Sequence, residues 1–148
     1  MPDETHVRQL VVFTLGQEQY ALPIEHVHEI IRYEAPRSVA APIPWIRGVI
    51  SLRGHIVAVL DLSARLGVQS EHNENAKIVI VESGSEAVGV IVDEVEEVLS
   101  IGEGAFEDVP GADAELVDSI VKIGDRLVVL IKPEMIFGAF TSTAAQVA

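Results

Sequence analysis

Two histidines and a carboxylate lie close together near residue 27 and could bind a metal. His26 and His28 are two positions apart, and Glu29 follows directly. In a β-strand, the two imidazoles would lie on the same face, and imidazole is a common ligand of zinc, copper and nickel. No third ligand stands at a spacing typical of a metal site. Because polar residues on the solvated face of a strand give the same pattern, we favour that interpretation and expect no metal.

Four carboxylates crowd into the segment VDEVEEV at residues 92–98, namely Asp93, Glu94, Glu96 and Glu97. Paired carboxylates can act as acid and base or bind Ca²⁺, but the internal glycine and ligand spacing of an EF-hand loop are missing. The G-x-S-x-G motif of a nucleophilic serine is also absent. The sequence therefore favours a solvated acidic face over a catalytic or ligand-binding one, and we expect no enzyme activity.

An arginine stands at the tip of a predicted hairpin. In GVISLRGHIVAVLDL (48–62), two runs of branched apolar residues flank Arg53 and Gly54. One interpretation is a surface arginine that aids solubility. The other is an arginine presented to an acidic partner, because arginine is enriched at the energetic centres of interfaces; Arg47 could serve the same end.

The composition excludes several functional classes. The chain has 148 residues, with 10 Lys and Arg against 23 Asp and Glu, and a formal net charge of −13. This charge argues against nucleic acid or an anionic membrane as a partner. The absence of cysteine excludes disulfides and thiolate chemistry, and no apolar run approaches the roughly 20 residues that span a bilayer. We expect a cytoplasmic protein without a cofactor and without direct membrane insertion.

The elements that would position these side chains are short strands. Apolar runs rich in valine and isoleucine, such as LVVFTL, KIVIVE and RLVVLI, are bounded by turn residues, which is typical of β-strands. Tight turns are predicted at 15–19, 53–54, 83–86 and 124–125, and each contains a glycine that can adopt positive φ. Short helices are predicted at 63–67, capped by Asp61 or Ser63, and from Pro133. The fold class is all-β.

The chain also repeats itself. Residues 10–31 align without a gap on 78–99, and residues 48–60 align on 119–131. Each copy offers about five strands, enough for a small barrel with few exposed edges. We expect one domain with a first subdomain at about 9–69, a linker at 70–76, a second subdomain at about 77–140 and a loose tail at 141–148. Two barrels of this size would share a core.

The segment IEHVHEIIRY (24–33) is a second candidate surface. Val27, Ile30 and Ile31 do not follow a period of two. They would either belong to the core or line an exposed apolar groove that takes a partner helix.

These motifs together resemble the chemotaxis coupling protein CheW family. The resemblance runs in order from about residue 9 to 137 through LVVFTLGQEQYALPIEHVHEIIR, RGVISLRGHIVAVLDLSARLG, VGVIVDEVEEVL and GDRLVVLI. It implies two tandem SH3-like five-stranded barrels around a shared core. It also implies a non-catalytic adaptor that joins the cytoplasmic tip helices of chemoreceptors to the regulatory domain of the histidine kinase CheA at membrane-associated receptor arrays.

The resemblance also implies the site residues. The receptor contact would involve Arg53 and Gly48, together with Val27, Glu29 and Ile30 at the border of a groove. The kinase contact would lie in the region of Val88, Val90 and Val92.

Some residues depart from the family pattern: Ser51, Ser119 and the ending IKPEMIF. These departures leave open a surface-motility or pilus pathway in place of flagellar chemotaxis. A small ligand-binding double barrel is the remaining alternative.

Overall fold

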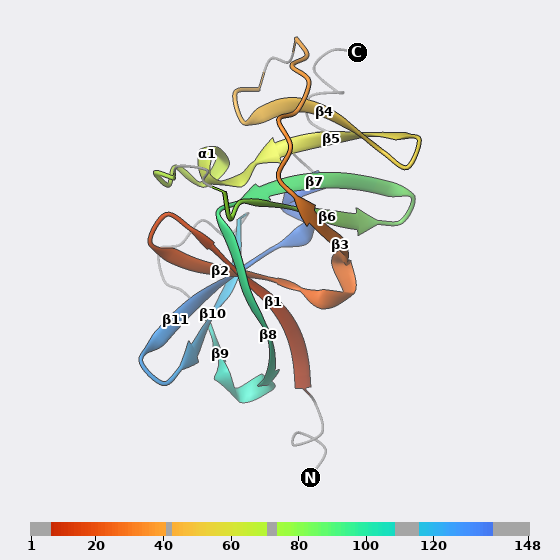
Figure 1. Cartoon of the computed structure of the whole chain (residues 1–148). Helices are drawn as coiled ribbons and strands as arrows, with labels where there is room; N and C mark the ends of the chain where they lie inside the picture. Colours follow the sequence, from red (N-terminus) through yellow and green to blue (C-terminus); the bar gives the residue numbers. More distant parts are fainter. Residues whose placement is uncertain (1–6, 41–42, 71–73, 109–115, 138–148) are drawn as a thin grey trace.

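The computed structural model describes residues 7–40, 43–70, 74–108 and 116–137. These residues form two β-sheets, which make up the upper and lower halves of the molecule in Figure 1. The predicted all-β class is confirmed, and the two sheets are consistent with two SH3-like barrels. Within these ranges, no helix has the length and hydropathy needed to cross a membrane.

The six-stranded sheet has the order β8-β1-β2-β11-β10-β9. Its strands are β1 (Val7–Leu15), β2 (Glu18–Pro23), β8 (Glu94–Gly102), β9 (Phe106–Glu107), β10 (Val117–Ile123) and β11 (Arg126–Ile131). Most neighbours are antiparallel, but β11 runs parallel to β2. A 3-10 turn, η3 (Glu103–Ala105), connects β8 to β9.

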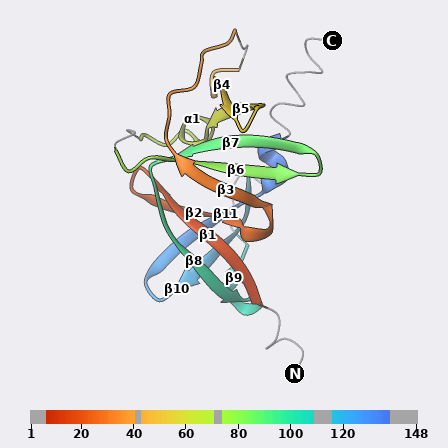
Figure 2. The same ribbon diagram turned by 45° about the vertical axis from the view of Figure 1, so that its right-hand side comes forward.

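The five-stranded sheet has the order β3-β6-β7-β5-β4. Its strands are β3 (Val27–Arg32), β4 (Ile46–Leu52), β5 (His55–Asp61), β6 (Lys77–Ser83) and β7 (Glu86–Val92). Here β5 is parallel to β7 and the other pairs are antiparallel. The 3-10 turn η2 (Ile24–His26) leads the chain from β2 into β3, so it crosses from one sheet to the other, as the two views show (Figures 1 and 2).

Each sheet takes strands from both sequence repeats. The hairpin β1–β2 of the first repeat joins β8 to β11 of the second, while the hairpin β6–β7 of the second repeat joins β3, β4 and β5 of the first. The predicted subdomains 9–69 and 77–140 are therefore units of sequence, and the sheets do not follow them. The alternation of apolar residues fixes which face of a strand is buried. Because the two hairpins carry the same pattern, the alternation does not determine whether a hairpin pairs with strands of its own repeat or of the other repeat.

The core has a shared part and one part within each sheet. The shared cluster includes Phe13 and Leu22 from the six-stranded sheet and Leu60, Val79 and Val90 from the five-stranded one, all at most 1% exposed. Separate clusters fill each sheet's own interior. The predicted shared core is thus present, and it is built from strands of both repeats.

The predicted turns and the first helix are confirmed. Turns occupy 16–17, 53–54, 84–85 and 124–125. The helix α1 (Leu62–Leu66) begins after Asp61, whose carboxylate accepts a hydrogen bond from the Ala64 amide, and ends at Gly67 with φ of 75°. Residues 133–137 are helical, as predicted from Pro133 onward.

Candidate functional site

Arg53 occupies a backbone conformation that disfavours its side chain. At the β4–β5 tip, Arg53 has φ of 50° and Gly54 has φ of 83°. Two successive positive values are what a type I′ hairpin turn needs. In the described part of the chain, Arg53 is the one non-glycine residue with positive φ. At the other three tips the first turn residue is a glycine, Gly16, Gly84 or Gly124. A left-handed conformation costs a non-glycine residue about 1–2 kcal/mol, so the arginine is present here at some expense of stability.

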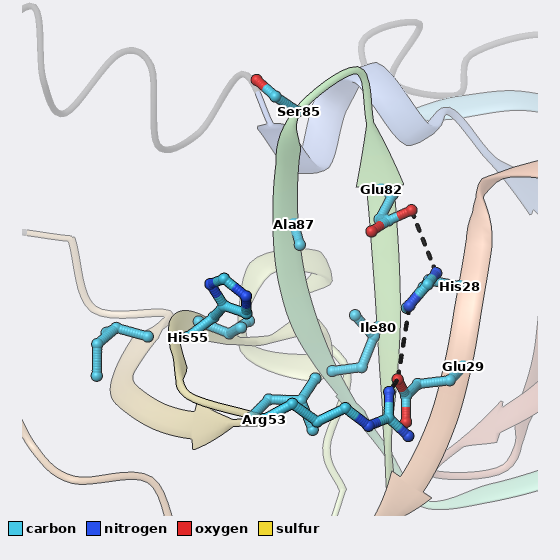
Figure 3. Close-up of a pocket in the computed structure, with 11 residues that line it drawn as sticks. His28, Glu29, Arg53, His55, Ile80, Glu82, Ser85 and Ala87 are labelled. Carbon is cyan, nitrogen blue, oxygen red and sulfur yellow. Dashed lines mark hydrogen bonds and ion pairs between the residues drawn. The ribbon is translucent and has the colours of Figure 1, made fainter.

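The side chain of Arg53 reaches across the sheet to β3. Its Nη1 donates to Oε1 of Glu29. The same Glu29 oxygen lies 3.6 Å from Nε2 of His28, and Nδ1 of His28 lies 3.3 Å from Oε1 of Glu82 on β6. Figure 3 shows this chain of four charged or polar groups, which runs along one side of a pocket. Exposed ion pairs contribute little to stability, so the main effect of this network is to orient Arg53.

A pocket of about 360 Å³ opens beside this network. Its floor is apolar, formed by side chains that belong to or pack against the interior cluster of the five-stranded sheet, namely Leu52, Val57, Ile80 and Ala87. The charged groups and His55 line the rest of the pocket. Ile56, at the edge, is 71% exposed. An apolar floor with a charged rim and an exposed aliphatic side chain suits a protein partner better than a small-molecule reaction.

Gly48 closes the five-stranded sheet into a barrel. After β3, Arg37 exchanges two backbone hydrogen bonds with Val49 of β4, with N–O distances of 2.8 and 2.9 Å, and so joins the two edges. Gly48 is buried with φ of 148°, and a Cβ atom there would overlap the backbone carbonyl oxygen of Arg37. Whatever its part in binding, Gly48 is required by the fold.

The apolar residues of β3 divide between core and surface. Val27 is half-buried and packs against the shared core, and Ile31 packs against the interior cluster of the five-stranded sheet. Ile30 is 39% exposed. Burial along β3 alternates strictly, with Val27, Glu29 and Ile31 on the less exposed face. The pattern in the sequence looks irregular because Glu29 lies on that face and Ile30 lies on the exposed one.

The chain is similar in sequence to known proteins over most of its length. The profile of the CheW-like domain family matches residues 9–140. The chain belongs to the CheW family. The chemotaxis protein CheW of Klebsiella aerogenes is 30% identical over 141 residues, which cover 92% of this chain and 85% of that protein. CheW of Bacillus subtilis is also 30% identical, over 93% of this chain and 91% of that protein.

A solved CheW structure shares the fold. The scaffolding protein TtCheW from Thermoanaerobacter tengcongensis superposes with a TM-score of 0.80 at 34% identity, covering 86% of this chain and 85% of that one. PilI of Pseudomonas aeruginosa matches less completely, with 27% identity over 84 residues, or 56% of this chain and 47% of that protein.

The valines expected at a CheW-type kinase contact are not on the surface. Val88, Val90 and Val92 are 5%, 0% and 0% exposed and belong to the shared core. Their strand, β7, is paired on both edges, with β6 and with β5. Their side chains cannot touch a partner without unfolding, so the assignment of this contact to these three residues is corrected. The segment AVGVIV is a continuous apolar run, which is typical of a strand that is buried on both faces.

The acidic segment at 93–97 is also not a uniform solvated face. Asp93 is buried, and its carboxylate accepts hydrogen bonds from the Gly16 amide, at 2.7 Å, and from the Ser70 hydroxyl. Glu96 accepts from Thr14 Oγ1, at 2.6 Å, and Glu97 is ion-paired with Arg126, at 2.7 Å. Asp93 ties the β1–β2 turn to the segment that follows α1, so its role is structural.

The structure separates the two histidines and gives Arg47 a structural role. His26, in η2, contacts the backbone carbonyl of Glu82, at 3.4 Å, whereas His28 lies between two carboxylates. Among the residues that the structure describes, no three His, Asp or Glu side chains are grouped to hold a metal ion. Arg47 is ion-paired with buried Asp61, at 3.2 Å, and therefore holds the end of β5.

Sequence reasoning missed the partners of the candidate residues, above all Glu82. The contact of Glu82 with β3 depends on the exchange of hairpins between the repeats, which the sequence did not reveal. The repeat itself carried one usable signal. Glu97 aligns with Glu29, and in the structure both are ion-paired with an arginine of a β-hairpin in their own sheet.

Proposed function

We propose that this chain is a non-catalytic adaptor that joins chemoreceptor tip helices to the regulatory domain of a CheA-type histidine kinase. Membership in the CheW family gives the general role, a scaffold in chemotaxis. The observation that supports the receptor contact most directly is Arg53, held in a left-handed turn and aimed over the pocket by Glu29. Such an adaptor would act in the cytoplasm at receptor arrays.

The receptor helix would bind through one carboxylate and adjacent apolar side chains. Arg53 uses Nη1 to hold Glu29 and its side chain is 69% exposed, so its other guanidinium donors can take a carboxylate in two parallel hydrogen bonds. Ile30 and Ile56, both exposed, lie on β3 and β5 of the same sheet and offer apolar contact. An amphipathic helix with an acidic residue beside its apolar stripe fits this surface.

The kinase must bind elsewhere, because an adaptor holds both partners at once. The buried valines of β7 do not supply that surface. Each interface would be small and reversible, and strength would come from many weak contacts in an array.

Kinase autophosphorylation tests the proposal. Membranes that carry a receptor and its CheA from the same genome would be assayed without this chain, with it, and with Arg53→Ala. We expect the wild type to activate the kinase and the variant to fail. The matched control is Arg126→Ala, which removes the ion-paired arginine of the other sheet and should still activate. Activation by Arg53→Ala at the wild-type level would contradict the role of Arg53, and no activation by the wild type would contradict the adaptor.

A pilus or surface-motility pathway is the second candidate, and the partial similarity to PilI favours it. The two candidates differ in the kinase that is bound. Pull-down of purified CheA-type kinases, one from each chemosensory gene cluster of the same genome, would separate them.

A further inference from the structure

His28 lies between two carboxylates that belong to different strands. Its Nδ1 is 3.3 Å from Glu82 Oε1 on β6, and its Nε2 is 3.6 Å from Glu29 Oε1 on β3 (Figure 3). An ionised carboxylate only accepts hydrogen bonds, and a neutral imidazole has one donor and one acceptor nitrogen. Only the imidazolium can donate to both neighbours. The contacts of His28 therefore depend on its protonation.

This dependence extends to Arg53 through a shared atom. The Glu29 oxygen that faces His28 also accepts from Arg53 Nη1. When His28 is charged, Glu29 is shared between two cations, and the Arg53 guanidinium is less strongly held by it. When His28 is neutral, Arg53 is the sole cation paired with Glu29 among the described residues.

The surroundings of His28 carry few other charges. The groups that face it or line its pocket are Glu29 on its own strand, Glu82 on β6, and Arg53 and His55 on the β4–β5 hairpin; His26 in η2 contacts only the carbonyl of Glu82. With both histidines neutral, one arginine and two carboxylates give the pocket a charge of −1. Protonation of His28 and His55 adds two positive charges and makes it +1. Acidification thus reverses the sign of the charge that a partner meets.

The second repeat provides an internal comparison. The offset of 68 places Glu96 where His28 lies and Thr14 where Glu82 lies. In the six-stranded sheet, these two are joined by a hydrogen bond of 2.6 Å from Thr14 Oγ1 to Glu96 Oε2. In the six-stranded sheet, the corresponding two strands are thus connected at this position without a histidine. The titratable bridge occurs in the sheet that also holds Arg53.

We propose that protonation of His28 strengthens the binding of an acidic partner helix at Arg53, so that the docking site responds to pH. This inference rests on the proposed receptor contact. His28 acts through Glu29 and is a positioning residue. Because His28, Glu82 and Arg53 are all substantially exposed, solvent weakens the coupling, and we expect an affinity change of about two- to fivefold, the range of one exposed ion pair.

The first test needs no partner. The ¹⁵Nε and ¹³Cζ resonances of Arg53 would be followed by NMR from pH 5 to 8, alongside the ring signals of His28. In the wild type, the Arg53 signals should move with the same midpoint as the His28 ring. In His28→Gln the part of that movement that follows the His28 midpoint should disappear, and in the control His26→Gln it should remain. Arg53 signals that do not move, or that move unchanged in His28→Gln, would overturn the coupling.

The second test measures affinity for a purified cytoplasmic tip fragment of a receptor from the same genome, at pH 6.0 and 8.0 and constant ionic strength. The wild type and His26→Gln should bind about two- to fivefold more tightly at pH 6.0, and His28→Gln should lose this difference. His55→Gln removes the other histidine of the pocket and retains His28, so it should keep this difference. Equal affinity at the two pH values in the wild type would overturn the inference. Absence of binding at either pH would contradict the proposed function, while the NMR test would still decide the coupling.

Discussion

The guanidinium of Arg53, at the tip of the β4–β5 hairpin, is ion-paired with the carboxylate of Glu29 on β3, and β4 and β3 are the two edge strands of their sheet. This contact accompanies the closure of the barrel that Arg37 and Val49 make through their backbones. It also places Arg53 over the pocket floor, in a position that its own turn makes energetically unfavourable. The positive φ of Arg53 therefore lowers the stability of the turn that places its side chain over the pocket.

The conflict predicts that Arg53→Gly is more stable than Arg53→Ala. Both variants lose the ion pair with Glu29, so that loss cancels between them. They differ in the turn, because alanine keeps the left-handed strain and glycine does not; we expect a difference of about 1 kcal/mol in the free energy of unfolding. Urea denaturation at pH 7 measures it. Equal free energies of unfolding would show that the turn relaxes in the variants. Because both variants lack the guanidinium, we expect neither of them to couple a receptor to the kinase.

The fold class and the turns could be predicted because they depend on local chemistry. Gly16, Gly84 and Gly124 mark turns by their tolerance of positive φ, and Asp61 marks a helix start. The exchange of hairpins could not be predicted, because either copy of the unit presents the same apolar faces. The burial of Val88, Val90 and Val92 does not depend on that exchange, because β7 is internal in its sheet just as β2 is in the other.

The candidate site was predicted only in part, because the sequence indicates local turns but not contacts between distant strands. Arg53 could be found because a hairpin tip is defined by its neighbours in sequence. Its contact with Glu29 spans 24 residues, and that of His28 with Glu82 requires the pairing of β3 with β6. Gly48 came from the family resemblance alone. Its physical role became clear only when Arg37 was found against it.

Gly48→Ala should destabilise the protein severely. The new methyl group would overlap the Arg37 carbonyl and would require φ of 148°, which side chains disfavour. We expect a loss of about 3 kcal/mol or more, as for overpacking combined with backbone strain. The matched control is Gly102→Ala, at an open position with φ of −70°, which should change the free energy of unfolding by less than about 0.5 kcal/mol. A normal thermal midpoint for Gly48→Ala would show that the 37–49 closure is dispensable.

Val27→Glu and Ile30→Glu should separate core from surface on β3. Val27 packs against the shared core, and a carboxylate there should cost about 1–3 kcal/mol. Ile30 is 39% exposed, so Ile30→Glu should change stability by less than about 0.5 kcal/mol while weakening the binding of a receptor fragment. Thermal unfolding and a binding isotherm on the same samples provide both readings. If Ile30→Glu bound the fragment normally, the exposed part of β3 would lie outside the docking surface.

Tyr20 should make the protein sensitive to alkali. Burial, and secondarily the negative charge of Glu18, raise the pKa of Tyr20 above its ordinary value of 10.0. A raised pKa in the folded state means that the neutral phenol is favoured there. Its contribution to stability is therefore complete below pH 10 and is lost as the pH rises through the folded-state value. Tyr20→Phe keeps the ring that stacks on Phe13, with centroids 6.4 Å apart, and removes the titrating group.

The expected result is that the free energies of unfolding of the two proteins diverge as the pH rises. At pH 7, urea denaturation should give similar free energies of unfolding for the wild type and Tyr20→Phe. Above pH 10, the wild type should lose stability faster than Tyr20→Phe, because ionisation of the buried phenol favours the unfolded chain. Tyrosinate absorbance near 295 nm, recorded in a Tyr33→Phe background to isolate Tyr20, should rise together with unfolding. If Tyr20 ionised fully while the protein remained folded and equally stable, the hydroxyl would have to be open to solvent and the burial argument would fail.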